Sequence, residues 1–167
     1  MRRKKWSTDA QVFPTKRLLE ARMPTCEEEK MIKPDCIFCK IANGEIPTNK
    51  VYEDESFVAI LDASPATRGH SLVIPKNHYT DLFEMSGDEA AEAMKRVHKV
   101  AGILKEKLNA DGMNLLQNNG EVAGQTVHHF HMHLIPRYLS DPKDISFTKQ
   151  KNADPDDIAK ILKAIND

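Results

Sequence analysis

The chain has 167 residues, and its 24 lysines and arginines against 25 aspartates and glutamates give a formal net charge of −1. This length suits one domain with an ordinary core, and without a basic excess the chain does not have the composition of a nucleic-acid-binding protein. No apolar run approaches the roughly 20 residues of a membrane-spanning helix, and three cysteines, an odd number, argue against a disulfide framework. We therefore expect a cytoplasmic protein with no membrane or nucleic-acid partner.

Residues 1–34 differ in composition from the rest of the chain. They begin with the basic run Met1–Lys5, contain the acidic run Glu27–Glu29, and carry prolines that interrupt any long helix. The basic run lacks the apolar core of a secretory signal. We interpret residues 1–34 as a poorly ordered N-terminal extension, residues 35–140 as the domain and residues 141–167 as a C-terminal segment with a helix.

The domain begins with a short predicted helix. Cys36–Asn43 is followed by Gly44, a residue that commonly ends helices, and Cys36 and Cys39 point the same way from its first turn. Two cysteines alone are a weak zinc signal. The alternative is a pair of reduced thiols that pack the helix against the core.

Strands are predicted next. Lys50–Glu53 and Phe57–Asp62 suit an antiparallel pair around a turn at Asp54, and His70–Ile74 supplies a third strand with a histidine at its start. Asp62 ends the second strand, where a carboxylate commonly caps the following turn.

The longest predicted element is a helix that opens with a capping box, Ser86 to Glu89. Apolar residues then recur at intervals of three and four, which predicts one face packed against the core. A strand at Met113–Gln117 and a glycine-containing turn come after it, and Asp154-Pro155 begins an amphipathic C-terminal helix. The apolar positions of the long helix are Ala90, Ala93, Met94, Val97, Ala101, Leu104 and Leu108, and those of the last helix are Ile158, Ile161, Leu162 and Ile165.

The segment Gln125–Pro136 carries an unusual pattern of histidines. Read as a β-strand, it places His129, His131 and His133 on one face and mainly apolar side chains on the other, with His128 as the polar exception. Alternate residues on one face lie roughly 6.6 Å apart, so neighbouring imidazoles can share one phosphate or one metal ion. The residues alone allow three interpretations, namely solvated surface groups, metal ligands, or a central nucleophile whose neighbours bind a phosphate.

The same segment resembles a family motif. His129–Ile135 fits the pattern His-φ-His-φ-His-φ-φ, where φ is apolar, of the histidine triad family of nucleotidyl hydrolases and transferases. Other segments match in the family's order over about residues 35 to 137, and the HINT-like bacterial branch is the most similar. These segments are Cys36–Ile41, Ile46–Pro47, Val51–Glu55, Gly69–Lys76 and Asn118–Gly120.

The resemblance implies a fold and a reaction. The fold is α+β, an antiparallel sheet of about five strands with one long helix packed on it, and two protomers pair as a homodimer. The reaction is hydrolysis of a nucleoside phosphoramidate or a related nucleotidyl phosphate, with a purine nucleotide as substrate. His131 attacks the α-phosphorus, a nucleotidyl-histidine forms, and water releases the nucleoside monophosphate. His133 and His70 are the other catalytic residues.

The resemblance also implies binding residues. Asp62 accepts hydrogen bonds from the ribose hydroxyls. The base lies in an apolar slot, and polar side chains of the turn before the triad contact the phosphate or the leaving group. The slot is formed by Ile37, Phe38, Ile46 and Ile60, and the polar contacts come from Asn118, Gln125 and Thr126.

Structural zinc is the implied cofactor, and no organic cofactor is expected. Bacterial proteins that this chain resembles hold zinc on four positions, all of which carry suitable ligands here: Cys36, Cys39, His78 and His129. Zinc binding removes His129 from direct chemistry.

Two alternatives and two departures remain. A sister branch of the family cleaves dinucleoside polyphosphates, and a non-enzymatic nucleotide-binding or partner-binding protein can retain the same pocket. His128 stands where relatives carry an apolar or aromatic residue, and the chain after Arg137 lacks the Trp-containing segment of eukaryotic HINT proteins. That segment shapes leaving-group specificity there, so the resemblance does not extend to the leaving group.

Overall fold

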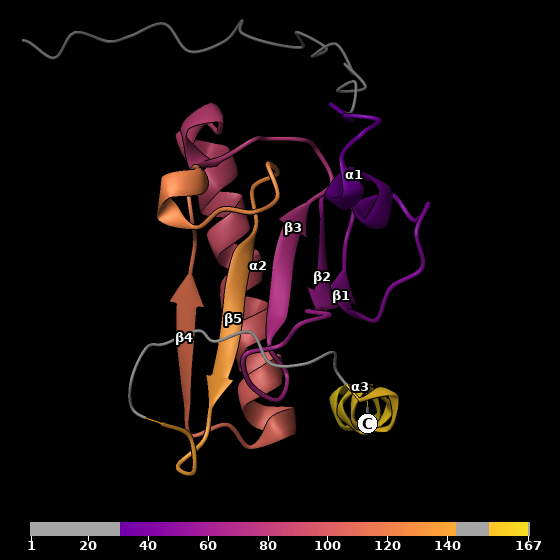
Figure 1. The fold of residues 1–167 in the computed structure, drawn as a ribbon, viewed down its shortest axis with the longest axis vertical. Coiled ribbons are helices and arrows are strands. Elements are labelled where there is room, and N and C mark those ends of the chain that lie inside the picture. The colour runs from indigo at the N-terminus through magenta and orange to yellow at the C-terminus, as the bar shows by residue number, and fades with distance from the viewer. Residues whose placement is uncertain (1–30, 143–153, 167) are drawn as a thin grey trace, which may run out of the picture.

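The fold is built around a five-stranded antiparallel sheet (Figure 1). The structure is a computed structural model that describes residues 31–142 and 154–166. The strands lie in the order β1-β2-β3-β5-β4. They are β1 (Lys50–Glu53), β2 (Phe57–Leu61), β3 (Ser71–Pro75), β4 (Gly112–Leu116) and β5 (Met132–Arg137). The predicted α+β class and the antiparallel sheet are confirmed.

The predicted long helix is α2 (Gly87–Leu108), which runs behind the sheet in Figure 1. Its capping box is formed, since the Ser86 side chain accepts from the Glu89 amide and the Glu89 side chain accepts from the Ser86 amide. It ends at Asn109, whose left-handed φ of 53° is a conformation that asparagine tolerates well. Each fully buried valine or leucine on its inner face contributes about 1.5–3 kcal/mol. That face comprises Ala93, Val97, Val100, Leu104 and Leu108.

The two faces of the sheet pack against different helices. In β2 every residue is buried, with Phe57, Ala59 and Leu61 in the core cluster that contains α2, and Val58 and Ile60 in the cluster that contains α1 (Ile37–Ala42). A strand covered on both faces reads as a continuous apolar run, as β2 does. Because side chains alternate along a strand, residues that face α1 share that side of the sheet with the triad histidines.

The predicted histidine strand is shorter than expected. β5 begins only at Met132, so His129 and His131 precede the ladder and His133 alone of the three lies within it. The prediction of a continuous strand was wrong because tertiary contacts capture the preceding segment. The amide of Phe130 donates to the carbonyl of Tyr79, 2.6 Å away and outside the sheet. The alternation itself persists, since Phe130 and Met132 lie in the cluster with α2.

The remaining helices are short, except at the C-terminal end. α3 (Pro155–Asn166) buries Ile161 and Ile165 in the cluster that contains α2, as the amphipathic pattern predicted. Arg68 Nε lies 3.9 Å from Asp157 Oδ1, which links α3 to the loop before β3. Two single-turn helices, η1 (Leu82–Glu84) and η2 (Glu121–Ala123), precede α2 and β5 respectively.

The described part of the chain includes only the end of the predicted N-terminal extension, and residues 1–30 lie outside it. The carbonyl of Met31 accepts from the amide of His78 at 2.6 Å. Across the described residues, none of the helices combines the length and apolar composition needed to cross a bilayer.

Candidate functional site

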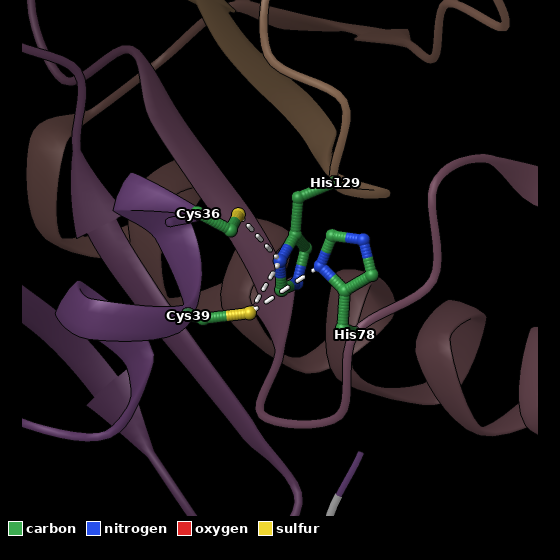
Figure 2. A group of neighbouring side chains, drawn as sticks. All are labelled: Cys36, Cys39, His78 and His129. Carbon is green, nitrogen blue, oxygen red and sulfur yellow. Dashed lines mark hydrogen bonds between the residues drawn. The ribbon is translucent and has the colours of Figure 1, made fainter. Parts of the chain in front are cut away.

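Two cysteines and two histidines converge between α1 and the start of β5 (Figure 2). In this cysteine–histidine cluster, Cys36 and Cys39 come from the start of α1, His78 lies after β3 and His129 precedes β5. Nδ1 of His129 lies 3.4 Å from Sγ of Cys36 and 3.5 Å from Sγ of Cys39, and Nδ1 of His78 lies 3.3 Å from Sγ of Cys39. Zinc bonds of about 2.3 Å to sulfur and about 2.0 Å to nitrogen put tetrahedral S and N donors about 3.5 Å apart. The cluster has these dimensions.

The hydrogen bonding of His129 also suits a metal ligand. Nε2–H of His129 donates to the carbonyl oxygen of Pro75 at 3.0 Å, so the Nδ1 lone pair faces the thiols. Metal-bound histidines commonly donate their second N–H to a backbone carbonyl in this way. Burial lowers the pKa of His129 to about 4, which keeps the ring neutral, and burial raises the pKa of the Cys39 thiol. Nε2 of His78 is buried without a hydrogen-bond partner among the described residues.

The central histidine has a defined tautomer. Nδ1–H of His131 donates to the carbonyl oxygen of His129 at 2.6 Å, and since a carbonyl only accepts, Nδ1 carries the proton. Burial lowers the pKa of His131, which favours the neutral ring. A neutral ring protonated at Nδ1 has its lone pair on Nε2, the form of imidazole that attacks electrophiles.

A second group, the histidine chain, consists of Asp62, His70 and His133. The amide of Ala66 donates to Nδ1 of His70 at 3.0 Å, so the proton of neutral His70 is on Nε2, 2.9 Å from Nδ1 of His133. His133 thus accepts at Nδ1 and carries its own proton on Nε2. Burial lowers the pKa of His70 although Asp62 raises it. Oδ2 of Asp62 lies 3.7 Å from Nε2 of His70, and its Oδ1 accepts from the amide of Ser64 at 2.8 Å.

The three residues of the histidine chain are close enough to suggest a second metal site, since their donor atoms lie within 4.8 Å of one another. The proton on Nε2 of His70 occupies the position that a metal would need. We therefore assign this group to hydrogen bonding rather than to metal binding.

The four predicted base-slot residues differ in exposure. Phe38 and Ile60 are buried, with 8% and 4% of their surfaces exposed, and belong to the core cluster beside α1. Ile37 is 51% exposed and Ile46 is half-buried. Ile37 and Ile46 therefore offer more surface to a ligand than Phe38 and Ile60 do.

Gln125, one of the predicted phosphate contacts, is 2% exposed, and both polar atoms of its side chain are hydrogen-bonded to backbone groups. Its Oε1 accepts from the amide of Gly120 at 2.7 Å, and its Nε2 donates to the carbonyls of Thr80 at 2.6 Å and Val127 at 3.1 Å. In this arrangement the side chain holds the turn before the triad against the segment after β3.

The other polar residues of this turn are more open. Nδ2 of Asn118 donates to the carbonyl of Gly124 at 3.3 Å, and Thr126 is exposed. His128, which the sequence did not explain, is exposed rather than packed in the core, and its Nε2 lies 3.3 Å from Oε1 of Glu121.

Sequence reasoning missed the backbone groups that set the protons of His129 and His70. The carbonyl of Pro75 and the amide of Ala66 determine which nitrogen of His129 and of His70 is free. The carbonyls of Tyr79 and Thr80 hold the turn that leads to the triad. Residue types carry no signal for such groups, because every residue except proline offers the same amide and carbonyl.

Comparison with known proteins adds the family. Residues 43–139 match the family model of the HIT domain. The chain is 51% identical over 128 residues to an uncharacterized HIT-like protein of Methanocaldococcus jannaschii, covering 77% of this chain and 98% of that one. It is 43% identical over 114 residues to the adenylylsulfatase HINT3 of Arabidopsis thaliana, covering 68% of this chain and 58% of that one.

Solved structures agree with these matches. A crystal structure described as a Zn-bound histidine triad family protein from Mycobacterium smegmatis superposes with a TM-score of 0.68 at 37% identity, covering 79% of this chain and 94% of that one. The similarity in fold therefore covers most of the chain and is not limited to the histidine motif.

Proposed function

The chain belongs to the histidine triad family, and on that premise we propose that it is a nucleotide hydrolase or transferase that works through a covalent nucleotidyl-histidine. One observation carries the proposal. His131 is held by the carbonyl of His129 in the tautomer whose Nε2 is nucleophilic. The substrates are nucleoside phosphoramidates or related nucleotidyl phosphates, with a purine preferred.

The reaction has two displacements at phosphorus. Nε2 of His131 attacks the α-phosphorus, the bond to the amine breaks, and the amine leaves with its electron pair and takes up a proton. Water then attacks the same phosphorus, the bond to Nε2 breaks, and the nucleoside monophosphate is released. Charge develops on the non-bridging oxygens in both steps, where preorganised N–H donors are most effective. The Nε2–H of His133, fixed through His70, is such a donor.

Substrate binding uses the elements around the triad. Asp62 accepts from the ribose hydroxyls, with His70 and His133 beside it. The base packs on the apolar slot, and the turn before the triad supplies polar contacts to the phosphate or the leaving group. The slot comprises Ile37, Phe38, Ile46 and Ile60, and the turn contributes Asn118 and Thr126, while the buried Gln125 holds the turn in place.

Zinc in the cysteine–histidine cluster is structural in this proposal. Two thiolates and two imidazoles fill a tetrahedral site and leave no open position for substrate, the usual property of structural zinc. Bound there, zinc would join α1 to the segments after β3 and before β5. Both cysteines are free thiols in the structure, as metal binding in a reducing compartment such as the cytoplasm requires.

A homodimer is proposed through β4. This strand ends the described sheet, and Leu115 on it is 49% exposed. An exposed sheet edge pairs readily with a second copy of itself. Sedimentation should give the mass of two chains, and a charged residue in place of Leu115 should weaken the association.

A specific observation favours a second substrate class. The relative HINT3 is named an adenylylsulfatase, and an adenylyl sulfate presents the same α-phosphorus with sulfate as leaving group. Dinucleoside polyphosphates, with a nucleotide as leaving group, are a further enzymatic alternative.

The test is turnover by the purified full-length protein on adenosine phosphoramidates, adenylyl sulfate and dinucleoside polyphosphates. His131→Ala should lower kcat by at least about 1,000-fold with its melting temperature close to that of the parent, because the variant lacks the attacking atom. His128→Ala, a change of the same size at an exposed neighbour, should leave kcat unchanged. Equal rates for His131→Ala and the parent would exclude the covalent route, and monophosphate binding without any product would indicate a non-enzymatic binding protein.

A further inference from the structure

Two contacts join the cysteine–histidine cluster to His131. The first is the hydrogen bond from Nδ1–H of His131 to the carbonyl of His129, whose side chain belongs to the cluster. The second passes through Phe38. Its ring lies edge-on to that of His131, with centroids 5.0 Å apart at 80°, and to that of His129, with centroids 6.1 Å apart at 75°.

The position of Phe38 depends on the cluster. It lies in sequence between the two thiol ligands, Cys36 and Cys39. Its helix, α1, has six residues, and the side chain at its N-cap makes no capping hydrogen bond. So short a helix is unstable alone, because nucleation costs more than one turn of hydrogen bonds returns. Metal bonds at Cys36 and Cys39 would therefore add to the core packing of α1 in fixing where this helix, and with it the ring of Phe38, lies.

The segment that carries His78, another ligand of the cluster, also contacts the triad segment. His78 directly precedes Tyr79 and Thr80, whose carbonyls accept from the amide of Phe130 at 2.6 Å and from Nε2 of Gln125 at 2.6 Å. The segment that carries the nucleophile is thus held from both sides by residues adjacent in sequence to cluster ligands.

We propose that Phe38 is a positioning residue through which the metal state of the cysteine–histidine cluster sets the orientation and tautomer of His131. This inference rests on the proposed nucleophilic role of His131. With zinc bound, the contact with the Phe38 ring and the carbonyl of His129 together select the position of the His131 ring that has Nε2 available. When the metal is lost, α1 relaxes, and His131 exchanges between its two neutral tautomers.

The experiment compares the zinc-loaded full-length protein with its Phe38→Leu variant. Leucine keeps an apolar side chain in the same core cluster and removes the aromatic ring. Aromatic pairs of this geometry are worth enough to change a rate roughly three- to tenfold. We expect kcat on an adenosine phosphoramidate to fall by this factor with zinc content unchanged, in addition to any change in KM from the loss of base contact.

The second readout does not depend on turnover. The ¹⁵N chemical shifts of the His131 ring report the fraction of the Nδ1–H tautomer, and this fraction should fall in Phe38→Leu and again when the parent is treated with a chelator. Ile74→Val is the matched control, because Ile74 is fully buried in the same core cluster. It should lower the melting temperature without changing the tautomer or kcat.

Three results would overturn the proposal. They are an unchanged tautomer in zinc-loaded Phe38→Leu, a change in KM alone, which would make Phe38 a base-binding residue only, and an equal loss of kcat in Ile74→Val. If chelation unfolds the parent, the comparison of the zinc-loaded variants with the zinc-loaded parent still tests the proposal. A parent that shows no turnover on any substrate would refute the proposed function, while the tautomer measurement would still test the role of Phe38.

Discussion

The cysteine–histidine cluster and the histidine chain lie on the same side of the sheet, and they differ in where their protons are. In the cluster, a backbone carbonyl takes the N–H of His129 and leaves its other nitrogen facing two thiols. In the histidine chain, a backbone amide donates to Nδ1 of His70, so the N–H of His70 is on Nε2 and faces His133. Identical side chains thus become a metal ligand in one place and a hydrogen-bond donor in the other. The choice is made by one backbone group at each site.

The largest expected effect is on zinc content and stability, and it comes from removing a ligand of the cysteine–histidine cluster. Cys39→Ala removes a fully buried ligand, so zinc content should fall and the free energy of unfolding should drop by more than about 3 kcal/mol, because metal binding contributes to folding. That corresponds to a fall of about 10 °C or more in melting temperature. Metal analysis and calorimetry measure both. Cys26→Ala, at the one cysteine of the sequence outside the cluster, is the control and should retain zinc. A variant that loses zinc at unchanged stability would contradict a structural role.

The next largest effect is on the catalytic rate, and it comes from breaking the histidine chain. His70→Ala removes the hydrogen bond that orients the half-buried His133, and the loss of one such hydrogen bond costs about 1–3 kcal/mol, so kcat should fall by roughly 10- to 100-fold. Zinc content should equal that of the parent. Steady-state kinetics together with metal analysis check the prediction. Loss of zinc in His70→Ala would mean that the two groups are not separate in function.

The smallest effect is on stability at acid pH. Burial lowers the pKa of His70 below its ordinary 6.5, so the unfolded chain binds its proton more readily than the folded one. The stability due to neutral His70 is complete above pH 6.5 and is lost as the pH falls toward the lowered pKa. Asp62, beside His70, acts in the opposite direction and limits the loss. In denaturant titrations, stability should therefore fall less steeply below pH 6.5 in His70→Asn than in the parent. Identical slopes would contradict the prediction.

Local sequence signals predicted most of the elements and their bounds. The capping box placed the start of α2, and the alternation and turn residues placed β1 and β2 within one residue, because these features depend on neighbours in sequence. The cysteine–histidine cluster was assembled only through the family resemblance, since Cys36 and His129 are separated by 93 positions. Pattern alone cannot bring such distant residues together.

The errors and omissions have one physical origin. The alternation of histidines predicted a strand from Gln125, but the amide of Phe130 pairs with Tyr79 outside the sheet, and β5 starts later. The orientations of His129 and His70 likewise depend on single backbone groups, the carbonyl of Pro75 and the amide of Ala66, which the side-chain pattern does not identify. Side-chain types in a sequence report propensity and alternation, whereas the partner of a given amide is settled by tertiary packing.

The six residues of α1 have a further consequence. Three consecutive side chains of this helix reach three environments: Ile37 the solvent, Phe38 the ring of His131 and Cys39 the thiol cluster. Because each residue of an α-helix turns the chain by about 100°, an insertion or deletion between Ile37 and Cys39 would rotate the residues after it relative to those before it, and the three side chains could no longer reach their targets together. The spacing of these three residues is therefore expected to be invariant.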